Sequence, residues 1–318
     1  MSNTLSLIGR RLLQLPVMIL GITFLVFFVM SFSPIDQARV ALGETASPEA
    51  LEAYRESHGL DLPLFARYLA FLAGLFRLDL GTYSARSLPV IDEVSRAFPV
   101  TISLTFFGLI IAVIIAFAIG VVAAVYRDRW PDQVIRFFGV AALSTPSFWL
   151  AILLIQVFTL GLGALPASGP LPDFWTEPVA WLARMTLPAV ALAVPVIGQL
   201  SRVVRTSMVE ELDKDYVRTA LGAGIPRVVV VGRNVLRNAL ITPVTVLGLR
   251  IGYLLGGAVV IEIIFAIPGM GTLILNGVTN NEPNLVQGVT LAVALAFVVI
   301  NIIVDLLYVL INPRIRAV

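Results

Sequence analysis

The chain has 318 residues, of which 58% are hydrophobic and only 13% are charged, and its formal net charge is +2. So apolar a composition indicates a membrane protein, and the small net charge, without a basic stripe, argues against nucleic acid as a partner. The chain has no cysteine and a single histidine, which excludes disulfides, thiol chemistry and a histidine-based metal site within it. We therefore expect this chain to bind no metal and no cofactor of its own.

The first hydrophobic segment, residues 12–32, follows Arg10 and Arg11. Its apolar run is long for a signal peptide, and no small-residue cleavage site follows it. We therefore interpret it as a retained membrane helix, with a signal peptide as the alternative.

The next region, residues 33–98, contains signals of short helices. Ser47-Pro48 is typical of an N-cap followed by proline at the first helical position, and His58-Gly59 is typical of a helix end. Residues 64–77 have a mostly apolar surface, which predicts a helix that lies in the membrane interface or packs on the other helices. We expect a small helical periplasmic cap; a signalling ectodomain is the alternative, for which the region is short.

Six segments are long enough to cross about 30 Å of hydrocarbon. They are residues 12–32, 99–126, 134–160, 186–206, 239–265 and 287–311. The sequence thus predicts an all-α membrane protein with six transmembrane helices. Thr145-Pro146-Ser147 interrupts the third segment and Pro188 and Pro195 interrupt the fourth, so we expect kinks at these positions.

Basic residues concentrate after the second and fourth segments and in the tail, whereas residues 161–185 and 266–286 contain only Arg184. The positive-inside rule then makes both termini cytoplasmic, in the inner membrane of a bacterium. The expected parts are the N-terminus with the first helix (1–32), the cap (33–98), a five-helix core (99–311) with a cytoplasmic loop at about 207–238, and a cytoplasmic tail (312–318).

The cytoplasmic loop is a hydrophilic island, residues 210–238, between long apolar segments. Residues 215–221 favour a short helix, Gly222 and Gly224 break it, and Pro226 stands where a first helical turn tolerates proline. Two short helices joined by a turn on the cytoplasmic face are suited to docking a soluble partner.

Three ionisable residues fall within or at the ends of predicted membrane helices, where charge is costly and suggests function. Arg250 lies mid-span, either in a structural contact between helices or beside a water-filled path that admits an anionic substrate group. We expect Glu262 to have a structural or gating role, and Asp305 to form hydrogen bonds between helices. Small residues four apart let backbones approach closely, either within the chain or against a second subunit; these are Gly248, Gly252 and Gly256.

Several motifs, in order along nearly the whole chain, resemble one known family. Arg218-Thr219-Ala220 followed by Gly224 resembles the EAA loop of ABC importer permeases. The runs DYVRTALGAGI and VLRNALITPVT resemble the dipeptide, oligopeptide and nickel permeases, as do RRLLQLPVMILGITFLVFF, LDLGTYS, FAIPGMG and NPRIR. Arg218 stands where the name-giving glutamate of the loop would be. Leu221 and Ala223 stand where basic residues are expected, so this loop is less positive than usual.

The resemblance implies a type I importer permease that pairs with a homologous second permease in the membrane. Two cytoplasmic ATPase subunits would hold ATP and Mg and dock below, and a periplasmic or lipid-anchored substrate-binding protein would dock above. It also implies that the ATPase-coupling loop contains Asp215, Tyr216, Arg218, Thr219, Ala220, Gly222 and Gly224. The implied substrates are di- or oligopeptides, with nickel chelates as the near alternative and opines, glutathione or sugars in some relatives.

Other classes of protein remain to be weighed. The chain has no phosphate-binding G-x-x-x-x-G-K-[ST] run and no convergent set of titratable groups, so we do not expect an enzyme. A channel or secondary transporter that works alone would need a charged pore lining or repeated halves, and neither is visible. A scaffold in an envelope complex is a third alternative.

Overall fold

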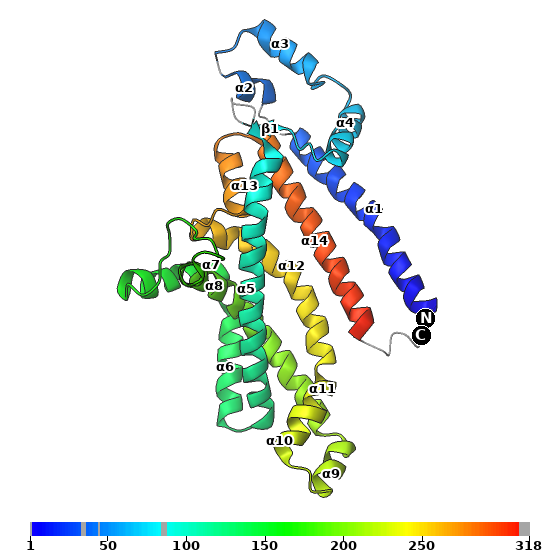
Figure 1. Ribbon diagram of the computed structural model, residues 1–318, viewed down its shortest axis with the longest axis vertical. Coiled ribbons are helices and arrows are strands. Elements are labelled where there is room, and N and C mark those ends of the chain that lie inside the picture. The colour runs from blue at the N-terminus through cyan, green and yellow to red at the C-terminus, as the bar shows by residue number, and fades with distance from the viewer. Residues whose placement is uncertain (1, 33–35, 44, 84–87, 312–318) are drawn as a thin grey trace.

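The computed structural model describes residues 2–32, 36–43, 45–83 and 88–311. Nearly all of them are helical (Figure 1). The helices are α1 (Ser2–Ser31), α2 (Gln37–Leu42), α3 (Pro48–Ser57), α4 (Leu64–Phe76), α5 (Val90–Val125), α6 (Trp130–Ser144), α7 (Ser147–Leu154), α8 (Pro178–Leu212), α9 (Asp215–Gly222), α10 (Arg227–Val229), α11 (Leu236–Ala239), α12 (Ile241–Ile264), α13 (Met270–Thr279) and α14 (Pro283–Ile311). Two π-helical turns, η1 (Ile155–Gly161) and η2 (Val230–Val235), and two short strands, β1 (Thr82–Tyr83) and β2 (Leu88–Pro89), complete the elements.

The centre of the fold is the packing of α5 against α8. Gly108 of α5 is so close to α8 that an added Cβ would lie 3.3 Å from the carbonyl oxygen of Ala189. At Gly120 an added Cβ would lie 2.9 Å from the carbonyl oxygen of Ser201. Because small residues occupy the contact, the two backbones approach closely, and van der Waals packing stabilises the pair. Helices α6, α7 and α12 then pack around α8.

Four helices among the described residues are long and apolar enough to cross a membrane, namely α5, α8, α12 and α14. The third predicted segment is two helices, α6 and α7–η1, bent by 102° at Thr145-Pro146, and the pair counts as a fifth span if taken together. Pro146 cannot donate a backbone hydrogen bond and starts a new helix, which explains the break. In α1, which has 30 residues, the side chains are described only for the apolar stretch Pro16–Ser31, so this helix is not counted among the spans. Six spans therefore stay a prediction.

The helices start and end somewhat differently from the hydropathy segments. α5 begins at Val90 rather than at residue 99 and accommodates Pro99 within the helix. Asp92 and Glu93 in its first turn made this part too polar to be recognised as membrane helix, yet acidic groups stabilise a helix N-terminus. α8 likewise begins at Pro178 rather than at residue 186, so that Arg184 lies in a helix rather than in a loop, and it continues to Leu212.

The region before α5 contains three short helices and the β1–β2 pair, at the opposite end of the molecule from α9 and α10 (Figure 1). The predicted start of α3 is confirmed: the hydroxyl of Ser47 accepts a hydrogen bond from the amide of Ala50, Pro48 is the first helical residue, and His58 is the C-cap. Arg55 of α3 pairs with Asp36, the N-cap of α2, and this contact holds the pKa of the Asp36 carboxyl below its usual range.

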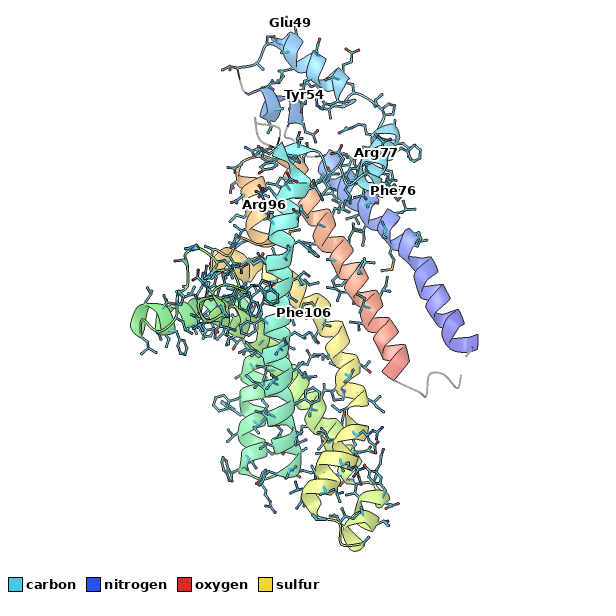
Figure 2. The ribbon with its side chains drawn as sticks, in the orientation of Figure 1. Glu49, Tyr54, Phe76, Arg77, Arg96 and Phe106 are labelled. Carbon is cyan, nitrogen blue, oxygen red and sulfur yellow. The ribbon has the colours of Figure 1, made fainter. Side chains whose placement is uncertain are left out.

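The apolar helix α4 packs on α1, which is one of the two arrangements expected for it. The hydroxyl of Tyr68 donates to the carbonyl of Leu20 and lies 3.0 Å from Oγ1 of Thr23. Aromatic contacts of Tyr68 with Phe24 and Phe27 surround this hydrogen bond. Phe76 and Arg77, at the end of α4, lie beside the upper part of α1 (Figure 2).

The predicted orientation is testable in this cysteine-free chain. Ser57→Cys on α3 should react fully with a membrane-impermeant maleimide added outside intact cells, because Ser57 is exposed. Thr219→Cys on α9, also exposed, should react only after the inner face is opened. The measurement is the labelled fraction of each variant before and after permeabilisation. The reverse pattern would contradict the assignment of both termini to the cytoplasm.

Candidate functional site

The island between α8 and α12 forms two helical pieces joined by a glycine turn. α9 ends in a Schellman motif, in which the amide of Ile225 donates to the carbonyl of Ala220 and the amide of Gly224 donates to that of Leu221. Gly224 has φ +81°, a left-handed conformation that side chains with a Cβ rarely adopt, whereas Gly222 is the last residue of α9. The predicted glycine break is therefore confirmed, and Pro226 is the N-cap of α10 rather than part of its first turn.

The helix α9 has one buried and one exposed face. Val217 is buried in an apolar cluster with Met208 of α8 and Val230 of η2. Asp215, Arg218 and Thr219 face solvent. Arg218 Nη1 lies 3.6 Å from Asp215 Oδ1, and because both side chains are exposed the pair contributes little to stability. The exposed face is therefore free for contact with another molecule.

The turn after α9 exposes an unusual amount of apolar surface for a polar loop. Every residue from 221 to 229 is exposed. The large apolar side chains are Leu221, Ile225, Val228 and Val229, and Val228 is 83% exposed. We call these four residues the apolar tip. Grouped exposed apolar residues beside polar ones are typical of a docking surface.

Polar contacts hold α9 to the end of α8. The phenol of Tyr216 donates to Oε1 of Glu211 over 3.1 Å and accepts a hydrogen bond from Nδ2 of Asn238. Burial raises the pKa of the Tyr216 phenol further above its ordinary value, and the neutral phenol is the hydrogen-bond donor. Lys214 pairs with the other carboxylate oxygen of Glu211. A displacement of α9 therefore acts directly on α8.

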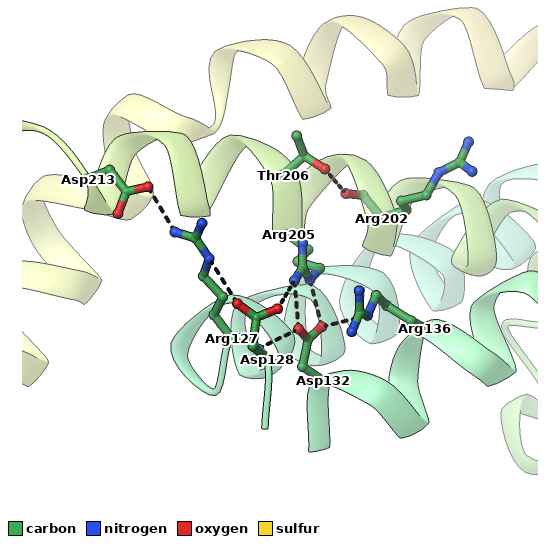
Figure 3. A network of polar contacts seen from close by, with 8 residues as sticks. All are labelled: Arg127, Asp128, Asp132, Arg136, Arg202, Arg205, Thr206 and Asp213. Carbon is green, nitrogen blue, oxygen red and sulfur yellow. Dashed lines mark hydrogen bonds and ion pairs between the residues drawn. The ribbon is translucent and has the colours of Figure 1, made fainter. Parts of the chain in front are cut away.

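A charged network ties the turn between α5 and α6 to the same end of α8 (Figure 3). Arg205 of α8 donates from Nε and Nη2 to the two carboxylate oxygens of Asp132, each over 2.6 Å. Asp132 is fully buried and also accepts the amide of Asp128 over 2.9 Å. Arg127 donates to Asp213, the C-cap of α8, over 2.8 Å. The central pair has no local signature in the sequence, because 73 positions separate its members.

The residues proposed for the membrane interior are placed on α12 and α14. Arg250 is half-buried, and its guanidinium lies 5.7 Å from the ring centroid of Tyr253, which is 52% exposed. Among the described residues its guanidinium has this cation–π contact and no hydrogen bond or ion pair. The side chain of Asp305 lies outside the described residues, so its role in hydrogen bonding stays a prediction.

The three spaced glycines of α12 have different surroundings. Added Cβ atoms at Gly248 and Gly252 would overlap Val304 and Phe297 of α14, so these two glycines permit packing within the chain. Gly256 is exposed and has nothing within 4 Å of an added Cβ. Of the three, only Gly256 is left facing away from the rest of the chain.

Buried polar groups hold the segment between α12 and α13 at the outer end. Arg184 is 2% exposed and donates to the carbonyls of Phe265, over 2.6 Å, and Ala167, over 2.9 Å. Glu262, fully buried, accepts the amide of Gly271 over 2.7 Å, and Thr101 of α5 accepts that of Met270 over 2.9 Å. These contacts give Glu262 a structural role, and its role in gating stays a prediction. The burial of Arg184 was not predicted from the sequence.

Comparison with known proteins agrees with this architecture. Residues 116–317 match the family model described as "Binding-protein-dependent transport system inner membrane component", and residues 4–105 match the model of its N-terminal part. The chain belongs to this family of transport permeases. It is therefore a multi-pass membrane protein and not an enzyme, and the reading as a channel or secondary transporter that works alone is set aside.

Similar proteins cover the permease from end to end. It is 40% identical over 312 residues to a "Putative peptide transport system permease protein" of Brucella abortus, with 98% of this chain and 99% of the relative covered. It is 38% identical over 312 residues to the "Glutathione transport system permease protein GsiC" of Escherichia coli, with the same coverage. It is 36% identical over 331 residues to the "Probable D,D-dipeptide transport system permease protein DdpB" of Escherichia coli, with 98% and 97% covered.

The buried pair under the coupling loop should be essential to the stability of the permease. Asp132→Asn should reduce the free energy of unfolding by about 3 kcal/mol, because it leaves the Arg205 charge without its partner. Asp128→Asn is the matched control: its carboxylate is 72% exposed and 3.9 Å from Arg205, so it should cost less than about 1 kcal/mol. The two variants are compared by thermal melting in the same detergent. Equal losses of stability would show that the buried pair contributes no more to stability than the exposed one.

Proposed function

We propose that the chain is one half of the membrane pathway of an ATP-driven importer for di- or oligopeptides. The observation that carries this proposal is the coupling loop: an apolar tip on an ordered glycine turn, joined by hydrogen bonds to α8, the most buried of the candidate spans. The names of the relatives, which refer to peptides, dipeptides and glutathione, support a peptide substrate over a nickel chelate.

The family and the two ends of the fold support three kinds of partner. Two ATPase subunits, which hold ATP and Mg, dock on α9 and the apolar tip. A substrate-binding protein docks over the region of α2, α3 and α4 on the periplasmic side. A homologous second permease completes the pathway, and the exposed Gly256 of α12 is a position where such a subunit could approach closely.

The mechanism is alternating access. Closure of the ATPases moves α9, and because Tyr216, Glu211 and Asn238 link α9 to α8 and α11, the movement reaches the core. The ATPase contact provides the difference in free energy between the inward-open and outward-open states, without which no shift would occur. The segment held by Arg184 and Glu262 lies at the other end of α8 and α12, where the outer mouth opens.

Substrate class is tested with the importer reconstituted in vesicles with its binding protein. Uptake of labelled di- and tripeptides above that of a nickel chelate at equal concentration is the expected result. Uptake of the chelate alone would contradict the peptide proposal while leaving the permease assignment intact.

The glycine turn provides a test of coupling. Gly224→Val forces a β-branched residue into a left-handed conformation, a strain of about 1–2 kcal/mol. The fraction of molecules in which the turn at residue 224 has its native conformation should fall about 5- to 30-fold. Uptake per ATP hydrolysed should then fall while the membrane helices remain folded. Gly232→Val is the control, because Gly232 lies in the same island with open space around it and no positive φ. Normal coupled uptake by Gly224→Val would disprove the role of this turn.

Arg250 provides a test of the pathway. If its charge attracts an anionic group of the substrate, Arg250→Gln should slow uptake about tenfold, the loss of about 1.5 kcal/mol expected for one charged hydrogen bond. Binding-protein affinity and the melting temperature should not change. A lower melting temperature with normal uptake would instead assign Arg250 to structure. Arg96→Gln, at the exposed outer end of α5, is the control for loss of one positive charge.

A further inference from the structure

A cavity of about 260 Å³ lies between α5, α6 and α8 at the end of the membrane helices nearest the coupling loop. Its walls are apolar and include Ile135, Val140 and Leu143 of α6. Arginines stand at its rim: Arg136, Arg202 and Arg205. The cavity therefore combines apolar walls with a cluster of cations, unlike a polar surface crevice. It takes no part in the contacts between α9 and α8 or in the proposed substrate pathway.

The cavity exists because α6 and α8 touch through glycines. A Cβ added to Gly198 would lie 2.6 Å from the carbonyl oxygen of Gly139, so the two backbones are in contact at this level. Two glycines contribute no side chains to fill the space beside the crossing. The exposed side of Val140, which is 58% exposed, makes the cavity reachable from outside the chain.

The rim carries more positive than negative charge. The buried carboxylate of Asp132 accepts both hydrogen bonds from Arg205, and Arg136 Nε lies 3.5 Å from the same group. Arg202 is exposed, and within the described part of the chain its guanidinium has no hydrogen bond or ion pair (Figure 3). One guanidinium is therefore free, and a second, on Arg136, is only weakly engaged.

The rim also lies at the depth expected of lipid headgroups. Tyr126 and Trp130, 44% and 74% exposed, flank the turn between α5 and α6, and such aromatic residues mark the membrane–water interface. Arg136 is six residues along α6 from Trp130, about 9 Å at the helical rise. An arginine side chain spans such a distance by extending toward the interface.

We propose that this cavity binds an anionic phospholipid of the cytoplasmic leaflet. Its phosphate is held by Arg202 and Arg136, and part of an acyl chain fills the apolar space against Val140 and Leu143. Guanidinium groups match phosphate geometry, and basic pockets between transmembrane helices on this side suit anionic headgroups. The proposal does not depend on the transported substrate. The bound lipid fills the gap beside the α6–α8 crossing, directly above the Asp132–Arg205 pair.

The test uses the full-length protein in detergent and native mass spectrometry. Phosphatidylglycerol and phosphatidylcholine with identical acyl chains are titrated separately, and the wild-type protein should retain phosphatidylglycerol at a several-fold lower concentration. Arg202→Gln should weaken phosphatidylglycerol binding about fivefold, which corresponds to about 1 kcal/mol for one arginine near a membrane surface, and leave phosphatidylcholine unchanged. The guanidinium of Arg202 has no hydrogen bond or ion pair within the described residues, so this variant should melt like the wild-type protein. Arg96→Gln is the matched control and should bind as the wild-type protein does.

Two further arms separate the sources of the phosphate and the occupants of the cavity. Val140→Trp fills the apolar space and should weaken phosphatidylglycerol binding without removing a charge. Inorganic phosphate at millimolar concentration should not displace the lipid. Displacement would show that the site binds an anion alone and that the acyl chain contributes nothing, which would overturn the proposal. Equal retention of the two lipids, or an unchanged affinity in Arg202→Gln, would overturn the proposal. Loss of the preference once partner subunits are assembled would also overturn it, because a protein rather than a lipid would then cover this face.

Discussion

The close contact of α5 with α8 is the constraint on which the other elements depend. Within a bilayer, lipid tails are as apolar as leucine, so helices associate through packing and polar contacts rather than through exclusion from water. Gly108 and Gly120 bring the two backbones together, and α8 becomes the most buried of the candidate spans. With α8 fixed, the start of α9 is fixed as well, and so is the direction in which residues 213–229 leave the helix bundle.

Polar contacts at the two ends of α8 complement this packing in different ways. Near the coupling loop, Arg205 and Asp132 neutralise each other in a bidentate pair. At the outer end, Arg184 has only carbonyl oxygens as recorded partners among the described residues, and these lie in two loops that α8 would otherwise not hold. An ion pair fixes the angle between two helices, whereas a cation on carbonyls fixes irregular backbone. Loss of Arg205 should therefore change the angle between α6 and α8, whereas loss of Arg184 should release the loops that contain its carbonyl partners.

The sequence predicted those features that arise from local physics. Hydropathy located α5, α8, α12 and α14, because a span of apolar residues is a local property. Ser47-Pro48 predicted the start of α3, and Gly224 predicted the turn after α9, since capping and left-handed backbone depend on a few neighbouring residues. The kink expected at Pro146 is present, but its size of 102° depends on how α7 packs against α8 and α12 and has no signature in the sequence.

Features that depend on distant residues were missed. Nothing near Asp132 identifies Arg205 as its partner, and Arg184 was assigned to a loop because the helix that contains it starts in a mixed polar segment. The glycines of α12 looked equivalent by spacing, yet α14 covers Gly248 and Gly252 and leaves Gly256 exposed. Which residues contact each other depends on how the helices pack, and the spacing of residues along one helix does not determine this.

The uninterrupted length of α8 restricts how homologous chains can vary. The helix runs 35 residues without a break, from Pro178 to Leu212, which is about 50 Å at the helical rise. The buried Arg184 lies near its start and Arg205 near its end. A single inserted or deleted residue between them would turn everything after it by about 100° around the helix axis. Arg205 would then point away from Asp132, and α9 would leave α8 in another direction. Insertions and deletions are therefore expected in surface loops, such as residues 162–177, and not within α8.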